Sequence, residues 1–336
     1  MSNESRHPSD GNTQLAPDVR VARRAFLAKA GMAALGVGVA AEALTAAQVA
    51  VPNSVGTEPP RLKATPNSAD CHIHIYDPRF QQHAPGRANP TSATVRDYRL
   101  LQKRTGTTRV VVVTPRNYVT DNRVTVDALS QLGASARGVV VVHPTITDAE
   151  LKDLNDVGVR GIRFSLTDPA IAVVTWDMVE PLSKRVADLG WHVQFALDGD
   201  LIVEHADLLR RLPAQLVFDH MGRPTLPAGT EHASLAVMRD LIDKGRTWIK
   251  LSGAYSNSRI GPPEYPEATK IAQAFVKAAP ERLVWGSDWP HPGLASDAKP
   301  NDAALFDLLG QWAPSTATRH RILVENPEML YGFTHA

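Results

Sequence analysis

The run Arg109-Val110-Val111-Val112-Val113-Thr114 is the stretch of this sequence that most limits the possible fold classes. Side chains alternate between the two faces of a β-strand, so four consecutive valines place apolar groups on both faces. Strands that are buried on both faces are typical of parallel sheets covered by helices. A second run, Val139–Val142, repeats the pattern. The two runs therefore predict an α/β protein with a parallel sheet.

Outward from these runs, short apolar segments alternate with segments of helical period. The expected strands are 70–76, 109–114, 138–143, 159–164, 192–196, 216–219, 249–251 and 283–286. Helices whose apolar residues recur every three or four positions are expected between them, among them 148–157, 176–189, 201–212, 235–244 and 269–278. Eight alternations predict one closed (β/α)₈ TIM-type barrel over residues 66–336. A doubly wound open sheet is the main rival, but it would usually carry an early glycine-rich phosphate loop, and this sequence has none.

Composition and charge exclude several classes of protein. The chain has 336 residues, of which 43% are hydrophobic and 21% charged, as in ordinary globular proteins. Lys+Arg number 36 and Asp+Glu 35, so no strong global field favours binding to nucleic acid or to a membrane surface. Cys71 is the only cysteine, which excludes an intrachain disulfide and a cysteine-rich zinc site. Any bound metal would need histidine and carboxylate ligands.

Residues 1–47 have the features of an export signal. Arg23-Arg24 precede a weakly apolar stretch of small residues from Ala30 to Ala41, which is too short to span a bilayer. The paired arginines resemble a twin-arginine signal, although Ala22 stands where that pattern usually has Ser or Thr. An amphipathic N-terminal helix is the alternative. We expect a periplasmic protein without a stable membrane anchor after signal removal, with 48–65 as a linker to the barrel.

The first strand carries two histidines. In Asp70-Cys71-His72-Ile73-His74, strict alternation would place the aspartate and both histidines inside the barrel. Cys71 and Ile73 would then face the helices. Two imidazoles inside a barrel are costly to bury unless they bind a metal, a substrate or one another. The pair therefore indicates a functional site.

Two more strands end on candidate catalytic residues. Asp288 follows the eighth strand and His220 follows the sixth. Taken singly, each could equally be a turn-capping aspartate or a loop histidine. Because chemistry in such barrels gathers at the C-terminal ends of the strands, we expect them to lie together with His72 and His74.

Five stretches resemble a known family. They are DCHIHIYD at 70–77, GVRGIRF at 158–164, DHMGRP at 219–224, KLSGAY at 250–255 and GSDWPH at 286–291. In this order they resemble the amidohydrolase-2 branch of the amidohydrolase superfamily. Within it they are most similar to the lactone hydrolases that act on 2-pyrone-4,6-dicarboxylate, 4-sulfomuconolactone and sugar lactones. The resemblance runs from about Asp70 to Phe333.

The resemblance implies that Asp288 is the general base, with His72, His74 and His220 around the reacting carbonyl. Opening a lactone needs a water, a group that takes its proton and stabilisation of the oxyanion. The expected function is hydrolysis of a small anionic lactone in aromatic catabolism. A sugar-acid lactone hydrolase, a lactone isomerase and a non-catalytic anion-binding barrel are the alternatives, and Asp288 argues against the last because an anion receptor gains nothing from a carboxylate.

The presence of a metal stays open at this point. His72, His74 and Asp288 would supply three ligands, the usual number at a catalytic zinc. Metal-binding relatives typically add a histidine from the fifth strand, but here Gln194 lies nearer its C-terminal end and His192 lies deeper. An amide is a poor zinc ligand. One zinc ion and a metal-free mechanism are therefore both compatible with the sequence.

Arginines at strand ends indicate the charge of the substrate. Arg163, Arg223 and Arg116 follow the fourth, sixth and second strands, and a guanidinium suits a carboxylate or sulfonate. A salt bridge to a local aspartate is the alternative for Arg163. Further candidates for substrate binding are Tyr118, Gln194, Tyr255 and Arg259. The pyrone-dicarboxylate enzymes tend to carry a second arginine in the loop after Arg163; its absence here favours a smaller or differently charged lactone.

Overall fold

The computed structural model describes residues 48, 50–83, 90, 92–168 and 172–334, so the expected export signal at 1–47 lies outside it. Eight parallel strands pair in sequence order. They are β1 (Ala69–Ile73), β2 (Arg109–Val113), β3 (Ala136–Val140), β4 (Val159–Ser165), β5 (His192–Ala196), β6 (Gln215–Phe218), β7 (Thr247–Leu251) and β8 (Leu283–Trp285). Ile73 bridges Trp289 beyond β8, and the backbone N–H of His74 donates to the carbonyl of Trp289 at 2.8 Å, which closes the barrel. The predicted (β/α)₈ barrel is confirmed.

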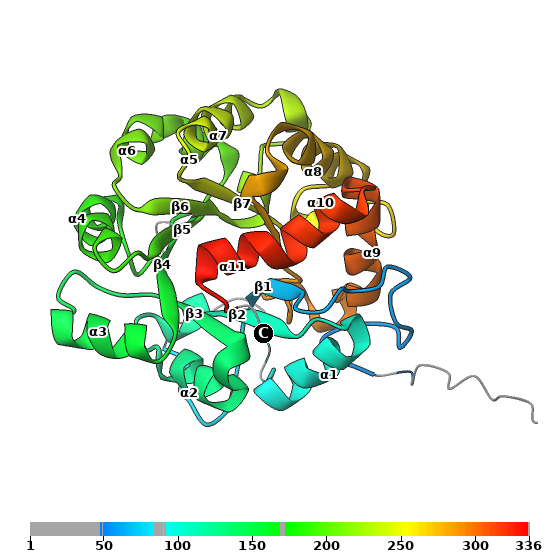
Figure 1. Cartoon of the computed structure of the whole chain (residues 1–336), viewed down its shortest axis with the longest axis horizontal. Helices are drawn as coiled ribbons and strands as arrows, with labels where there is room; N and C mark the ends of the chain where they lie inside the picture. Colours follow the sequence, from blue (N-terminus) through cyan, green and yellow to red (C-terminus); the bar gives the residue numbers. More distant parts are fainter. Residues whose placement is uncertain (1–47, 49, 84–89, 91, 169–171, 335–336) are drawn as a thin grey trace, which may run out of the picture. The chain divides into compact units, whose positions relative to one another are not determined.

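Helices surround the barrel on its outside (Figure 1). They are α1 (Val95–Thr105), α2 (Arg123–Leu132), α3 (Asp148–Asp156), α4 (Trp176–Ala187), α5 (Gly199–Glu204), α6 (Ala206–Arg211), α7 (Ala233–Asp243), α8 (Pro266–Ala278), α9 (Asp302–Trp312), α10 (Thr316–His320) and α11 (Asn326–Tyr331). The single helix expected at 201–212 is instead α5 and α6. It breaks at His205, which takes φ −102° and ψ 18° and stacks its ring on Trp176 of α4. In the part of the chain that the structure describes, no helix is long and apolar enough to cross a membrane.

A bulge in β1 changes which side chains face the barrel. Three steps along β1, from Asp70 to Ile73, match only two along β2. Cys71 lies in the apolar cluster inside the barrel, and Asp70 accepts a hydrogen bond from Tyr98 of α1 at 3.3 Å. The expectation that Asp70 faces inward and Cys71 faces the helices is therefore wrong, because a bulge adds a residue and shifts the alternation. His72 nevertheless faces inward, beyond the bulge.

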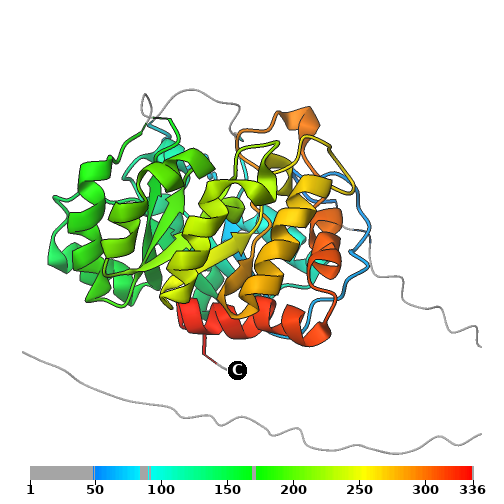
Figure 2. The ribbon, with the colours of Figure 1, turned by 90° about the horizontal axis from the view of Figure 1, so that it is seen from above.

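The N-terminal end of the barrel is sealed by the end of the chain. Leu330, Tyr331 and Phe333 join the apolar cluster inside the barrel, and α11 lies across this end (Figures 1 and 2). Arg137 donates to the carbonyls of Tyr331 and Gly332 and lies over the Phe333 ring at 4.7 Å. Access from solvent is therefore left to the opposite end, where the strands finish.

The segment 50–65, expected as part of a linker, lies against the barrel. The buried Arg104 of α1 donates to the carbonyls of Val55 and Glu58 and to Ser54 Oγ. The indole N–H of Trp289 donates to the carbonyl of Pro52 at 2.8 Å. We call residues 51–58 the N-terminal strap. It contacts the loop that follows β8, the same loop that carries Asp288.

Candidate active site

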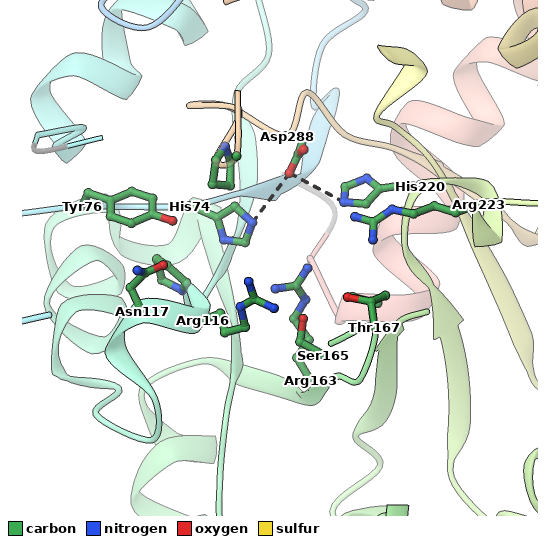
Figure 3. A pocket seen from close by; sticks show the side chains of 14 residues that line it. His74, Tyr76, Arg116, Asn117, Arg163, Ser165, Thr167, His220, Arg223 and Asp288 are labelled. Carbon is green, nitrogen blue, oxygen red and sulfur yellow. Dashed lines mark ion pairs between the residues drawn. The ribbon is translucent and has the colours of Figure 1, made fainter. Parts of the chain in front are cut away.

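A pocket opens at the C-terminal ends of the strands (Figure 3). Its lining is strongly polar and comes from six strand ends. The lining residues are His74, Tyr76, Pro115, Arg116, Asn117, Arg163, Ser165, Thr167, Ala196, His220, Arg223, Asp288, Pro292 and Gly293. Barrel enzymes place their chemistry at this end, because loops after each strand can supply side chains to one common space.

Asp288 lies at the centre of three imidazoles. Its Oδ1 is 3.5 Å from His72 Nε2, 3.6 Å from His74 Nε2 and 3.8 Å from His220 Nε2. The two Nε2 atoms of His72 and His74 are 3.2 Å apart. All four side chains are buried, and among the described residues Oδ1 has no hydrogen-bond partner. The structure thus brings together all four residues predicted to be catalytic.

Each imidazole is oriented from behind through its Nδ1 atom. His74 Nδ1 lies 2.8 Å from the carbonyl of Val113, which can only accept, so the proton of a neutral ring sits on Nδ1. His220 Nδ1 contacts Ser252 Oγ at 2.8 Å. His72 Nδ1 lies 3.1 Å from Asp219 Oδ1 and 3.2 Å from Lys250 Nζ. The Nε2 atoms face the cluster, as they do where histidines ligate a metal.

The group His72, His220 and Asp288 could hold a metal ion, and His74 lies beside it. Four ligands at the usual zinc distances would stand about 3.3 Å apart at the corners of a tetrahedron. Asp288 Oδ1 lies 3.5 and 3.8 Å from the Nε2 atoms of His72 and His220, close to that value. Imidazole and carboxylate groups also suit zinc chemically. The sequence predicted His72, His74 and Asp288 as the ligands of a possible metal; the group that the structure brings within ligand distance has His220 in place of His74.

Burial sets the protonation of the cluster. It lowers the pKa of His220 to about 3, and it lowers the pKa values of His72 and His74 as well. Burial alone would raise the pKa of Asp288, but the attraction of His220, His72 and His74 outweighs it and lowers that pKa below its ordinary value. At neutral pH an ionised carboxylate thus faces neutral imidazoles. This is the state in which a carboxylate can accept a proton.

Three arginines share the pocket with this cluster. Figure 3 shows the side chains of Arg116, Arg163 and Arg223 reaching into the same space. Arg163 Nε donates to Asp219 Oδ2 at 3.0 Å, so it has a carboxylate partner while also lining the pocket. Within the described part of the chain, Arg223 forms a long ion pair with Asp198, at 3.9 Å. The pocket therefore presents more positive than negative charge to a ligand.

Comparison with known proteins identifies the family to which this barrel belongs. A sequence profile described as "Amidohydrolase" matches residues 69–333, which is the whole barrel. The chain belongs to the amidohydrolase family. The match covers both the strand that carries His72 and His74 and the loop that carries Asp288.

Three relatives of this amidohydrolase have names that describe an action on lactones. The 4-sulfomuconolactone hydrolase of Rhizobium radiobacter is 33% identical over 86% of this chain and 99% of its own length. The 2-pyrone-4,6-dicarboxylate hydrolase of Comamonas testosteroni is 34% identical over 81% of this chain and 92% of its own. The D-galactarolactone isomerase of Agrobacterium fabrum is 32% identical over 79% and 90%. A crystal structure of an Agrobacterium tumefaciens protein superposes with a TM-score of 0.77 at 30% identity and covers 84% of this chain and 99% of its own.

Four residues expected to bind substrate are not among those that line the described pocket. Arg259 is 62% exposed and pairs with Glu267. The Tyr118 hydroxyl points to the carbonyl of Asp77 at 3.5 Å. Gln194 is buried beneath the cluster, where its Oε1 accepts from Lys250, and Tyr255 lies behind Asp288. Their place in a loop or on a strand was readable from the sequence, but the direction of each side chain was not.

Two buried charged residues of the amidohydrolase site were missed. Asp219 lies on the inner face with Arg163 and His72 as partners, and Lys250 donates to the carbonyl of Cys71 at 2.8 Å and to Gln194 at 2.7 Å. Burial lowers the pKa of Lys250 to about 8. A signal for both existed, because a charged side chain within an otherwise apolar strand has to find a partner inside the barrel.

Proposed function

We propose that this amidohydrolase hydrolyses a small anionic lactone in the catabolism of aromatic compounds. The observation that supports it is the buried Asp288 Oδ1, which has no hydrogen-bond partner among the described residues and faces the same pocket as three arginines. The site thus combines a proton acceptor with binding groups for a carboxylate or sulfonate. The names of the two hydrolase relatives agree with both features.

In the proposed mechanism, Asp288 takes a proton from the attacking water. Asp288 is ionised at neutral pH, because its pKa lies below the ordinary aspartate range, and its Oδ1 has no hydrogen-bond partner among the described residues, so it can accept the proton. His220 and His74 line the pocket on either side and would contact the lactone carbonyl. The proton then passes to the ring oxygen that leaves, and the product is a hydroxy acid.

His72, His220 and Asp288 would hold a divalent cation in this site, with His74 beside them. When bound, such an ion would polarise the lactone carbonyl and stabilise the oxyanion. The chain's own residues orient that cluster in either case: the Val113 carbonyl, Asp219 and Ser252 fix the three rings. The pocket arginines add positive charge next to the developing oxyanion.

The substrate is proposed to carry one or two anionic groups. Arg116, Arg163 and Arg223 enter the pocket from three different strand ends, which suits a ligand whose charges are spread around a ring. Each guanidinium can bind a carboxylate or sulfonate through two parallel hydrogen bonds. A muconolactone that bears a sulfonate or carboxylate fits this requirement.

A panel of lactones tests the proposal. The panel consists of 4-sulfomuconolactone, 2-pyrone-4,6-dicarboxylate, D-galactarolactone and the neutral δ-valerolactone, with a pH indicator because each hydrolytic turnover releases acid. We expect acid release with at least one anionic lactone and little with δ-valerolactone. Preference for the neutral lactone would contradict the proposal.

Lactone isomerisation is the second candidate, supported by the isomerase among the relatives. The two reactions differ in product mass, because hydrolysis adds one water and isomerisation adds none. Mass spectrometry of the product from each panel lactone therefore separates them. A product of unchanged mass, formed without acid release, would replace hydrolysis by isomerisation.

We further propose that the protein is exported to the periplasm by a twin-arginine signal. The proposal rests on Arg23-Arg24 and the short apolar stretch after them. The double variant Arg23→Lys, Arg24→Lys should stay in the cytoplasm as the uncleaved chain, measured by cell fractionation. Normal export of that variant would remove the twin-arginine assignment.

A further inference from the structure

The two oxygens of the Asp288 carboxylate have different surroundings. Oδ2 accepts a hydrogen bond from the Tyr255 hydroxyl at 2.5 Å. Oδ1 faces the three imidazoles and has no hydrogen-bond partner among the described residues. One oxygen is therefore held from behind, while the other is left for the cluster and the pocket.

A chain of polar contacts continues behind Tyr255. The Tyr255 hydroxyl lies 3.2 Å from His291 Nδ1, with the two rings edge to face at 82°. On its far side, His291 Nε2 lies 3.2 Å from Asp302 Oδ2. His291 and Asp302 are fully buried, and neither lines the pocket among the described residues. Their side chains reach the Asp288 carboxylate through Tyr255, and the His291 backbone N–H also donates to the Asp288 carbonyl at 2.7 Å.

The number of available protons sets the donor and the acceptor in each of these contacts. A phenol carries one proton, and the ionised Asp288 carboxylate can only accept it. The Tyr255 oxygen is then free to accept, so His291 must donate to it from Nδ1–H. A second proton, on His291 Nε2 or on Asp302 Oδ2, is then needed for the 3.2 Å contact between these two atoms to be a hydrogen bond, and with it the contacts form an ordered line from Asp302 to Asp288.

The far end of this line is fixed to the barrel. Asp302 begins α9, and its backbone N–H donates to Ser54 Oγ of the N-terminal strap at 3.2 Å. Lys299 Nζ donates to the carbonyls of Pro290, His291 and Leu294, which fastens the loop that carries His291.

The backbone of this loop also needs such support. Asp288 and His291 take φ values of 64° and 57°, in the left-handed region that side chains other than glycine seldom adopt. Conformations of this kind persist where surrounding contacts hold them, and they occur frequently at functional sites. The fastened loop therefore supports both ends of the line.

We propose that Tyr255, His291 and Asp302 are positioning residues for Asp288. The proposal rests on the proposed function, in which Asp288 is the base. The three residues stop the carboxylate from turning about its side-chain axis and keep Oδ1 directed at the water and the carbonyl. A reacting group held in the productive geometry gains rate without gaining affinity, so the line should affect kcat and leave KM nearly unchanged.

A double-mutant cycle tests the line with the panel lactone that is opened fastest. Tyr255→Phe keeps the ring and removes the donor; we expect kcat to fall about 10- to 100-fold, the usual scale for a hydrogen bond to a charged group. Asp302→Asn should also lower kcat. The double variant should be no slower than Tyr255→Phe, because Asp302→Asn keeps the backbone contacts of residue 302 and its side chain reaches the Asp288 carboxylate through Tyr255.

Two controls keep the result interpretable. Tyr331→Phe removes a buried hydroxyl that has no partner among the described residues, and it should leave kcat unchanged. Asp288→Asn is measured in parallel. Wild-type kcat in Tyr255→Phe combined with an inactive Asp288→Asn would overturn only the positioning line. Multiplicative losses in the double variant, or a rise in KM in place of a fall in kcat, would overturn it too. Activity retained in Asp288→Asn would instead overturn the proposed base.

Discussion

Replacing Arg223 by methionine tests whether the pocket recognises an anion. The Arg223 side chain is 26% exposed and pairs only at 3.9 Å with Asp198, which is itself half exposed. Its removal leaves no buried acid without a partner, so the variant should fold normally. A contact between a guanidinium and an anion contributes about 1.5–3 kcal/mol, and partial exposure favours the low end, so KM for an anionic lactone should rise about tenfold.

The assay compares one anionic lactone with the neutral δ-valerolactone. Loss of a charge contact should raise KM for the anionic lactone and change KM for the neutral one by less than about twofold, because only the first has an anion to lose. Arg259→Met is the matched control, since Arg259 is 62% exposed and pairs with Glu267 away from the pocket. Equal increases for both lactones, or the same increase in Arg259→Met, would refute the assignment of Arg223 to anion recognition.

Four further predictions follow from the same contacts. Asp288→Asn should fold but lose on the order of 10²–10⁴ in kcat, together with the acid limb of the pH–rate profile; because the pKa of Asp288 is lowered, that limb in the wild type should lie below the ordinary aspartate range. If a zinc ion is catalytic, metal analysis should find about one zinc per chain and a chelator should abolish turnover; full activity of the stripped protein would show that the mechanism needs no metal. Arg163→Met should cost about 1.5–3 kcal/mol in the free energy of unfolding, measured by denaturant titration, because the buried Asp219 loses a charged hydrogen bond but keeps Lys250 and His72 beside it. A chain that begins at residue 66 should lose about 4 kcal/mol by the same measurement, roughly one for each hydrogen bond that Arg104 and Trp289 make to the strap.

The strands could be predicted because each is a short apolar run, and their order followed from the alternation with helices. Val110–Val113 forms most of β2, and its side chains divide between the inner and outer clusters as expected for a strand covered on both sides. The bulge in β1 could not be predicted. A bulge is a change of pairing register, which depends on the neighbouring strand, whereas a single strand's pattern contains only its own alternation.

The cluster of His72, His74, His220 and Asp288 was predictable for a geometric reason. Each residue ends or directly follows a strand, and the ends of parallel strands in a barrel meet in one place. Tyr255 lies further into its loop, so its distance from the strand could not tell whether it faces the pocket or the back of Asp288. The structure places it behind Asp288, which changes its interpretation from a substrate contact to a positioning residue.

Asp219 explains why replacing Arg163 and replacing Arg223 should affect kcat differently. One of its oxygens lies 3.1 Å from His72 Nδ1, and the other accepts from Arg163 Nε at 3.0 Å. A single buried carboxylate therefore connects an arginine of the pocket with a histidine of the Asp288 cluster. An anion that draws Arg163 toward the pocket weakens its hold on Asp219, and Asp219 orients the ring of His72. Loss of Arg163 should thus lower kcat as well as raise KM, whereas loss of Arg223, which has no such link, should raise KM alone.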